Sequence, residues 1–105
     1  MTTMWIGPDE NLRVGDKGFL VEHSNPFQGW ERHELRDTPA HTNQSRKPRL
    51  NGWCGSWNDT GTYGRGVWRV IRVAKNGRCL IQELGGDERQ AVLDELGYPD
   101  LTDED

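Results

Sequence analysis

The sequence predicts a mainly β protein: a small, partly open antiparallel β-barrel of about five strands with one short C-terminal helix. Asn76-Gly77 separates two runs rich in β-branched and apolar residues, which is the pattern of a β-hairpin. Glycine and proline interrupt most of the remaining chain, and one stretch near the C-terminus has the spacing of a helix. An antiparallel sheet packed against that helix is the alternative architecture.

The first strand is expected at residues 18–23, after a turn at 15–18. Residues 1–10, which precede them, are expected to contribute little regular structure. Val14-Gly15-Asp16 and the strand that follows resemble the opening of small barrels of the Src-homology or KOW type, and the resemblance extends over residues 12–23. It implies a small barrel.

Residues 24–48 are predicted to form a long irregular loop. Prolines at its start, middle and end interrupt it, and residues 30–36, WERHELR, fit either a turn of helix or a strand. A connection of this length inside a compact domain is commonly functional, so residues that determine specificity are expected there. After it, a strand is expected at 50–57 and a turn-rich loop at 58–66.

Residues 67–84 are predicted to form the central hairpin of the fold. Asn76-Gly77 supplies two residues that tolerate positive φ, as a two-residue type I′ turn requires. That turn places Val73 opposite Leu80 on the neighbouring strand. In this register neither face of the hairpin alternates cleanly between apolar and polar residues, so another element is expected to cover part of the second face.

The C-terminal helix is predicted at residues 88–96. Asp87 is a candidate N-cap with Gln90 at the capping-box position, and Gly97 ends the element. A helix this short needs packing to be stable, so its apolar residues are expected to cover the sheet. Residues 1–98 then form a single domain, and residues 99–105 form a disordered acidic tail.

Composition limits the classes to which the protein can belong. The chain has 105 residues, of which 32% are hydrophobic, enough for one small core. No run approaches the roughly 20 apolar residues of a membrane span, and the start lacks the basic and apolar regions of a signal peptide. Two cysteines without an export signal suggest reduced thiols. We therefore expect a cytoplasmic protein outside the membrane.

The residue patterns do not predict catalysis. The three histidines lack the spacing of a zinc site, and the two cysteines form no Cys-x-x-Cys pair. Ser56 lies in Cys-Gly-Ser-Trp, which is not the nucleophile elbow of hydrolases. The glycines at 61, 64 and 66 lead into a strand and do not match a phosphate-binding loop. We expect a non-enzymatic protein that uses no cofactor and no metal.

Charge is segregated along the chain, although the net charge is only −4. Residues 83–105 contain nine acidic residues and one basic residue, whereas residues 46–82 contain eight basic residues and one acidic residue. This distribution predicts a basic working surface and an acidic terminal segment. The alternative is that the two regions neutralise each other within the fold.

Basic and aromatic residues occur together in the middle of the chain. Single-stranded nucleic acid needs cations along a phosphate path and ring faces on which bases stack. We therefore expect binding of single-stranded DNA or RNA, modulated by the acidic tail, with Trp53 and Trp68 in the core. The candidate residues for this site are Arg46, Lys47, Arg49, Trp57, Tyr63, Arg65, Lys75 and Arg78.

The alternative function is a protein-binding adaptor or inhibitor of the kind that mobile genetic elements carry. Exposed Trp, Tyr and Arg side chains dominate the energetics of interfaces. A hairpin that is apolar on both faces can also form a homodimer or extend a partner's sheet. The acidic end would dock on a basic partner or imitate a nucleic-acid backbone. Its candidate partner-binding residues are Asp103, Glu104 and Asp105.

Overall fold

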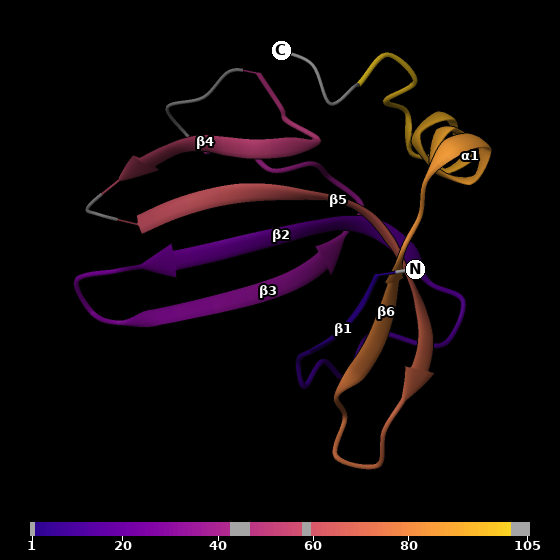
Figure 1. Ribbon diagram of the computed structural model, residues 1–105, viewed down its shortest axis with the longest axis horizontal. Coiled ribbons are helices and arrows are strands. Elements are labelled where there is room, and N and C mark those ends of the chain that lie inside the picture. Colours follow the sequence, from indigo (N-terminus) through magenta and orange to yellow (C-terminus); the bar gives the residue numbers. More distant parts are fainter. Residues whose placement is uncertain (1, 43–46, 58–59, 102–105) are drawn as a thin grey trace.

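The computed structural model describes residues 2–42, 47–57 and 60–101, without the side chains of 56, 57 and 60. In this part of the chain the elements are β1 (Thr3–Ile6), β2 (Lys17–Asn25), β3 (Trp30–Arg36), β4 (Asn51–Trp57), β5 (Thr60–Val73), β6 (Cys79–Glu83) and α1 (Gly86–Leu96). The strands pair in antiparallel fashion and form one strongly curled sheet, with α1 at one side (Figure 1). The predicted class, a mainly β, partly open barrel with one C-terminal helix, is confirmed.

The two longest strands, β2 and β5, form the middle of the sheet. The strand order is β1-β6-β5-β2-β3, and β4 pairs with the first half of β5. Bulges in the pairing of β5 with β2 and with β6 add to the bending of these strands. The edge strands β1 and β3 both line one groove of about 800 Å³. The barrel is therefore open between its two edges.

The buried apolar residues form two clusters, one on each face of β2. Phe19 and Val21 belong to the first cluster and Leu20 to the second, because successive side chains of a strand point to opposite faces. Helix α1 contributes Val92 and Leu93 to the first cluster and so covers that face. The continuous apolar run of β2 follows from this two-sided burial.

The first correction concerns residues 24–48, which are not one irregular loop. They contain β3, which pairs with β2 from Phe19–Arg36 to Asn25–Trp30. Asn25 holds the turn between the strands, because its Oδ1 accepts the backbone N–H groups of Phe27 at 3.0 Å and Gln28 at 3.1 Å. β3 carries mostly charged residues, as edge strands commonly do, so it shows no apolar period.

The second correction concerns two segments for which no strand was expected. Residues 1–10 contain β1, and the glycine-rich residues 60–66 are part of β5. β1 pairs with β6, and residues 60–66 are the first half of β5. A Cβ atom at Gly64 would lie 2.6 Å from the carbonyl oxygen of Arg49 and 2.7 Å from that of Leu50. Glycine at this position therefore lets the segment that enters β4 cross close to β5.

The β5–β6 hairpin is confirmed, but its turn and register differ from the prediction. The Gly77 N–H donates to the carbonyl oxygen of Ala74 at 3.0 Å, and Gly77 has a φ of +87°. The turn is thus centred one residue earlier than expected, and Gly77 follows it as a bulge. Val73 consequently pairs with Cys79 rather than Leu80.

Helix α1 ends where the sequence predicts but begins differently. Gly85 occupies the N-cap without a side-chain hydrogen bond, and the predicted cap residue Asp87 lies in the first turn. Gly97 ends the helix with a φ of +91°. Beyond it, Tyr98 packs edge-on against Phe19, with ring centroids 5.5 Å apart. Leu101 also packs against the first cluster, so the fold extends to that residue.

Candidate binding site

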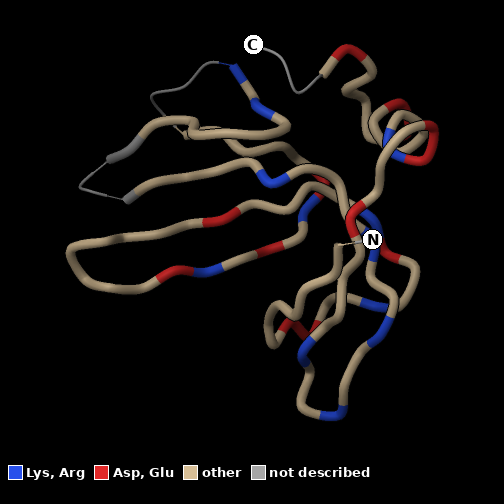
Figure 2. The backbone as a smooth tube through the Cα atoms, in the orientation of Figure 1, with Lys and Arg blue, Asp and Glu red and all other residues tan. Residues whose placement is uncertain are grey.

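The basic and aromatic residues predicted to bind nucleic acid are divided between two regions. Tyr63 and Arg65 lie on β5, Lys47 and Arg49 precede β4, and Lys75 and Arg78 lie in the connection between β5 and β6. That connection lies at the far end of the molecule from β4 (Figure 1), and Lys and Arg are spread along the chain (Figure 2). Arg46, the Trp57 side chain, Asp103, Glu104 and Asp105 lie outside the described residues.

Arg65, the predicted cation closest in sequence to the aromatic residues, is paired within the fold. Its Nε and Nη2 atoms lie 2.7 Å and 2.5 Å from Oε2 of Glu22, whose residue is only 8% exposed. The guanidinium also lies over the Tyr63 ring, 5.1 Å from its centroid. His33 approaches the same carboxylate at 4.0 Å. The charge of Arg65 is therefore largely compensated by Glu22.

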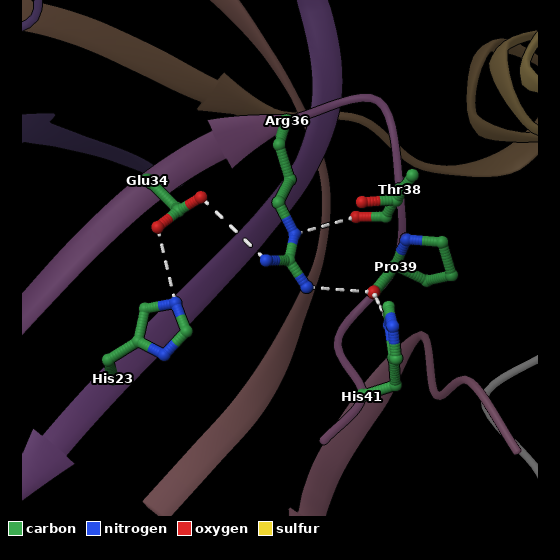
Figure 3. A network of polar contacts seen from close by, with 6 residues as sticks. All are labelled: His23, Glu34, Arg36, Thr38, Pro39 and His41. Carbon is green, nitrogen blue, oxygen red and sulfur yellow. Dashed lines mark hydrogen bonds and ion pairs between the residues drawn. The ribbon is translucent and has the colours of Figure 1, made fainter. Parts of the chain in front are cut away.

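A second polar network lies on the opposite face of β2 and β3 (Figure 3). Glu34 lies between His23, at 3.2 Å, and Arg36, at 3.7 Å. Arg36 donates to the carbonyl oxygens of Thr38 and Pro39, each at 3.0 Å. Burial lowers the pKa of His23, and the nearby Glu34 carboxylate partly offsets this effect. The network holds the segment after β3 against the sheet.

Three exposed aromatic residues lie outside these polar networks. Trp53 is 53% exposed, Trp30 is 40% exposed and Phe27 is 80% exposed. The prediction that Trp68 is buried is confirmed, since it is 4% exposed, whereas the prediction that Trp53 is buried is wrong. Cys54, the next residue of β4, takes the core position, so the alternation of the strand directs Trp53 to the uncovered face.

These rings surround a groove of about 640 Å³ at the end of the sheet where the β2–β3 turn lies (Figure 1). Its floor is a row of directly paired residues, Glu31 on β3, Ser24 on β2 and Gly61 on β5. The cross-strand pair of Tyr63 and Trp53 follows on the same face. Phe27 in the β2–β3 turn and Trp30, the first residue of β3, line the other side. We call this site the aromatic groove.

Local contacts fix the walls of the aromatic groove. The indole N–H of Trp30 donates to Oε1 of Gln28 at 2.9 Å. A Cβ atom at Gly61 would lie 3.0 Å from the Tyr63 ring, so the missing side chain leaves room for that ring. Asn25 is buried and holds the turn that carries Phe27. Contacts within the chain therefore position the turn and the rings that line the groove.

Sequence reasoning missed Phe27, Trp30 and Trp53 as site residues. A signal was present for the first two, because Asn25 followed by proline and glycine is typical of a turn between strands. Recognising that turn would have placed Trp30 at the start of a strand beside β2. Trp53 had no such signal, since its exposure depends on which face of β4 the helix covers.

The two cysteines are buried, and their environment favours the neutral thiol. Burial raises the pKa of the Cys54 and Cys79 thiols, although Arg49 partly offsets the effect at Cys54. The Cys54 Sγ also donates to the carbonyl oxygen of Ala40 at 3.0 Å. Across residues 2–42, 47–57 and 60–101, no group of three or more His, Cys, Asp or Glu side chains is arranged to hold a metal ion.

The described helix, α1, is neither long nor apolar enough to cross a membrane.

The aromatic groove is the feature that best combines open space, exposed apolar surface and fixed geometry in the described part of the chain. In comparisons with protein-family models, curated proteins and solved structures, nothing matches this chain.

Proposed function

We propose that the protein is a non-enzymatic adaptor or inhibitor that holds a segment of another protein in the aromatic groove. The observation that carries this proposal is the gathering of four aromatic side chains, Phe27, Trp30, Trp53 and Tyr63, around one groove. Contiguous exposed apolar surface of this kind commonly marks an interaction site. Trp and Tyr are also the residues that contribute most to binding energy at protein interfaces.

The charge around the groove favours a protein over a nucleic acid. Glu31 is the one charged residue in the described lining, and it is acidic. Arg65 stands beside Tyr63, but Glu22 compensates its charge. Nucleic-acid sites need cations along the phosphate path as well as rings. Rings without that path are better suited to apolar and cationic side chains of a protein.

A capture experiment with matched variants tests this function. The full-length protein is immobilised and exposed to a nuclease-treated extract of the cells that produce it, and the retained proteins are identified by mass spectrometry. Trp53→Ala should reduce capture of the partner by more than about tenfold, as expected for a central aromatic residue. Trp5→Ala is the control, because Trp5 is similarly exposed but lies on β1. Equal capture of the partner by the wild type, Trp53→Ala and Trp5→Ala would rule out the aromatic groove as the binding site.

Single-stranded nucleic-acid binding is a second candidate, favoured by the cations of the β5–β6 hairpin. Arg72, Lys75 and Arg78 are exposed there, and residues 60–82 contain no Asp or Glu. Affinity for a labelled oligonucleotide should then fall steeply between roughly 50 and 200 mM salt, and Lys75→Ala should reduce the slope by about one. Truncation after residue 101 should strengthen binding by removing competing acidic residues. The absence of binding at low salt would exclude this candidate.

A further inference from the structure

We propose that the aromatic groove recognises a cationic side chain, a lysine or arginine that the partner protein inserts between Trp30, Trp53 and Glu31. This inference rests on the proposed function and specifies the chemistry of the partner. Three properties of the groove support it: the exposure of its rings, the sign of its charge and the shape of its floor.

The rings provide the first argument. The face of an aromatic ring carries partial negative charge and attracts a cation within about 6 Å of its centroid. Trp53, Trp30 and Phe27 present large exposed surfaces to the groove. The protein already contains one such contact at the groove's edge, where the Arg65 guanidinium lies 5.1 Å from the centroid of Tyr63. The remaining rings offer equivalent positions to a cation from outside.

The charge provides the second argument. Glu31 lies at one end of the floor, and among the ion pairs of the described residues none involves it. Lysine and arginine are missing from the described lining, and Arg65 is compensated by Glu22. A cation entering the groove would therefore meet one uncompensated carboxylate as well as the rings. The Glu31 carboxylate and the faces of the rings would both repel an anionic side chain.

The shape of the floor provides the third argument. Ser24 and Gly61 lie between Glu31 and the ring of Tyr63, and both are small. The Tyr63 ring occupies the space over Gly61, so the small side chain of Ser24 leaves the slot in which the aliphatic stem of a lysine or arginine can lie along the rings while its charged end reaches the Glu31 carboxylate. The volume of about 640 Å³ is within the usual range for small-ligand pockets.

The test titrates the full-length protein with four probes and follows the indole N–H resonances by NMR. The probes are the N-acetyl amides of lysine, arginine, norleucine and glutamate, at constant ionic strength. The lysine and arginine probes should bind about 2- to 30-fold more tightly than the uncharged norleucine probe, the range expected of cation–π contacts. Signals of Trp30 and Trp53 should shift, while that of Trp5 should not.

Charge variants separate this inference from the proposed function. Glu31→Gln should weaken the cationic probes and leave the norleucine probe unchanged, and Glu10→Gln is the matched control at an exposed position outside the groove. Glu31→Lys should reduce capture of the protein partner at least about tenfold by placing a like charge beside the incoming cation. Equal binding of norleucine and lysine, or unchanged capture by Glu31→Lys, would overturn the cationic ligand. If Trp53→Ala still abolishes capture, the groove remains a protein-binding site; if it does not, both proposals fail.

Discussion

The two halves of β5 lie in one continuous strand but have different surroundings. In the second half, Val67, Trp68 and Val70 are buried, and β6 covers the edge that β4 covers in the first half. The first half contains Gly61, Gly64 and Gly66, and Tyr63 lines the aromatic groove. One strand thus supplies both the core and the candidate binding surface.

A lack of buried positions in the fold does not by itself explain why aromatic rings are exposed. Hydrophobic residues make up only 32% of the chain, and the second half of β5 contributes to apolar clusters on both of its faces. Trp53, Trp30 and Phe27 nevertheless remain outside both clusters. Leaving such large apolar surfaces in water forfeits stability that their burial would supply. The binding role proposed above would account for that arrangement.

The largest expected contrast is between Trp68 and Trp53. Trp68→Ala removes a buried ring whose indole N–H donates to the Arg65 carbonyl oxygen at 2.6 Å. It should lower the free energy of unfolding by about 3–5 kcal/mol, measured by urea denaturation. Trp53→Ala removes an exposed ring and should change stability by no more than about 0.5 kcal/mol. Similar losses from both variants would contradict the contrast between the core half of β5 and the exposed surface that Trp53 of β4 forms beside the first half of β5.

Glycines within the first half provide a smaller contrast. Gly64→Ala places a Cβ atom 2.6–2.7 Å from two backbone oxygens, which cannot move without shifting the segment before β4. We expect a loss of about 1–3 kcal/mol in thermal or urea denaturation. Gly61→Ala meets the Tyr63 ring at 3.0 Å, and a ring can move more easily than backbone. Its loss should be smaller, and an equal loss would show that the ring is held rigidly.

The parts of the fold with strong local signals were predictable. Asn76-Gly77 identified the hairpin and Gly97 the end of the helix, because glycine in the left-handed region marks both. β3 was not predictable, since Glu31, Arg32 and Glu34 remove any apolar alternation from an edge strand. The register of the hairpin was also missed, because a bulge at Gly77 cannot be distinguished from a two-residue turn by residue type.

The candidate site was predictable only in part. Tyr63 was selected as a site candidate because it falls among glycines in the sequence, and it lines the aromatic groove. The groove itself joins residues 24–31, Trp53 and residues 61–63, which meet only through the pairing of β2, β4 and β5. Local patterns do not contain that pairing. They also cannot reveal that Glu22 compensates Arg65 from a neighbouring strand.

The protonation of His23, which lies opposite Thr62 in the first half of β5, should make stability depend on pH. Burial lowers its pKa below the ordinary value of 6.5. Glu34 opposes this shift by raising the pKa, whereas Arg32 and Arg36 lower it further. The unfolded chain therefore binds this proton more readily, and its uptake favours unfolding. The contribution is fully present above about pH 6.5 and is lost as the pH falls toward the folded pKa. Urea denaturation at several pH values should show this decline in the wild type and less of it in His23→Gln.

The smallest expected effect concerns α1, which covers the cluster containing Val67 in the second half of β5. Gly85 occupies the N-cap with extended backbone angles, and open space surrounds the position that a Cβ atom would take there. Gly85→Asp would let a carboxylate accept a free N–H of the first turn, and should raise stability by a few tenths of a kcal/mol.

The neighbouring glycine is the matched control for this prediction. Gly86→Asp places the same charge one residue later, where φ is +56° and a side chain is strained. It should therefore lower the melting temperature while Gly85→Asp raises it by about 1–3 °C. Shifts of the melting temperature in opposite directions would establish that the cap geometry stabilises α1, the helix that covers the core half of β5. Equal shifts would mean that the added charge acts on the sheet beneath, and Gly85 would then have no capping role.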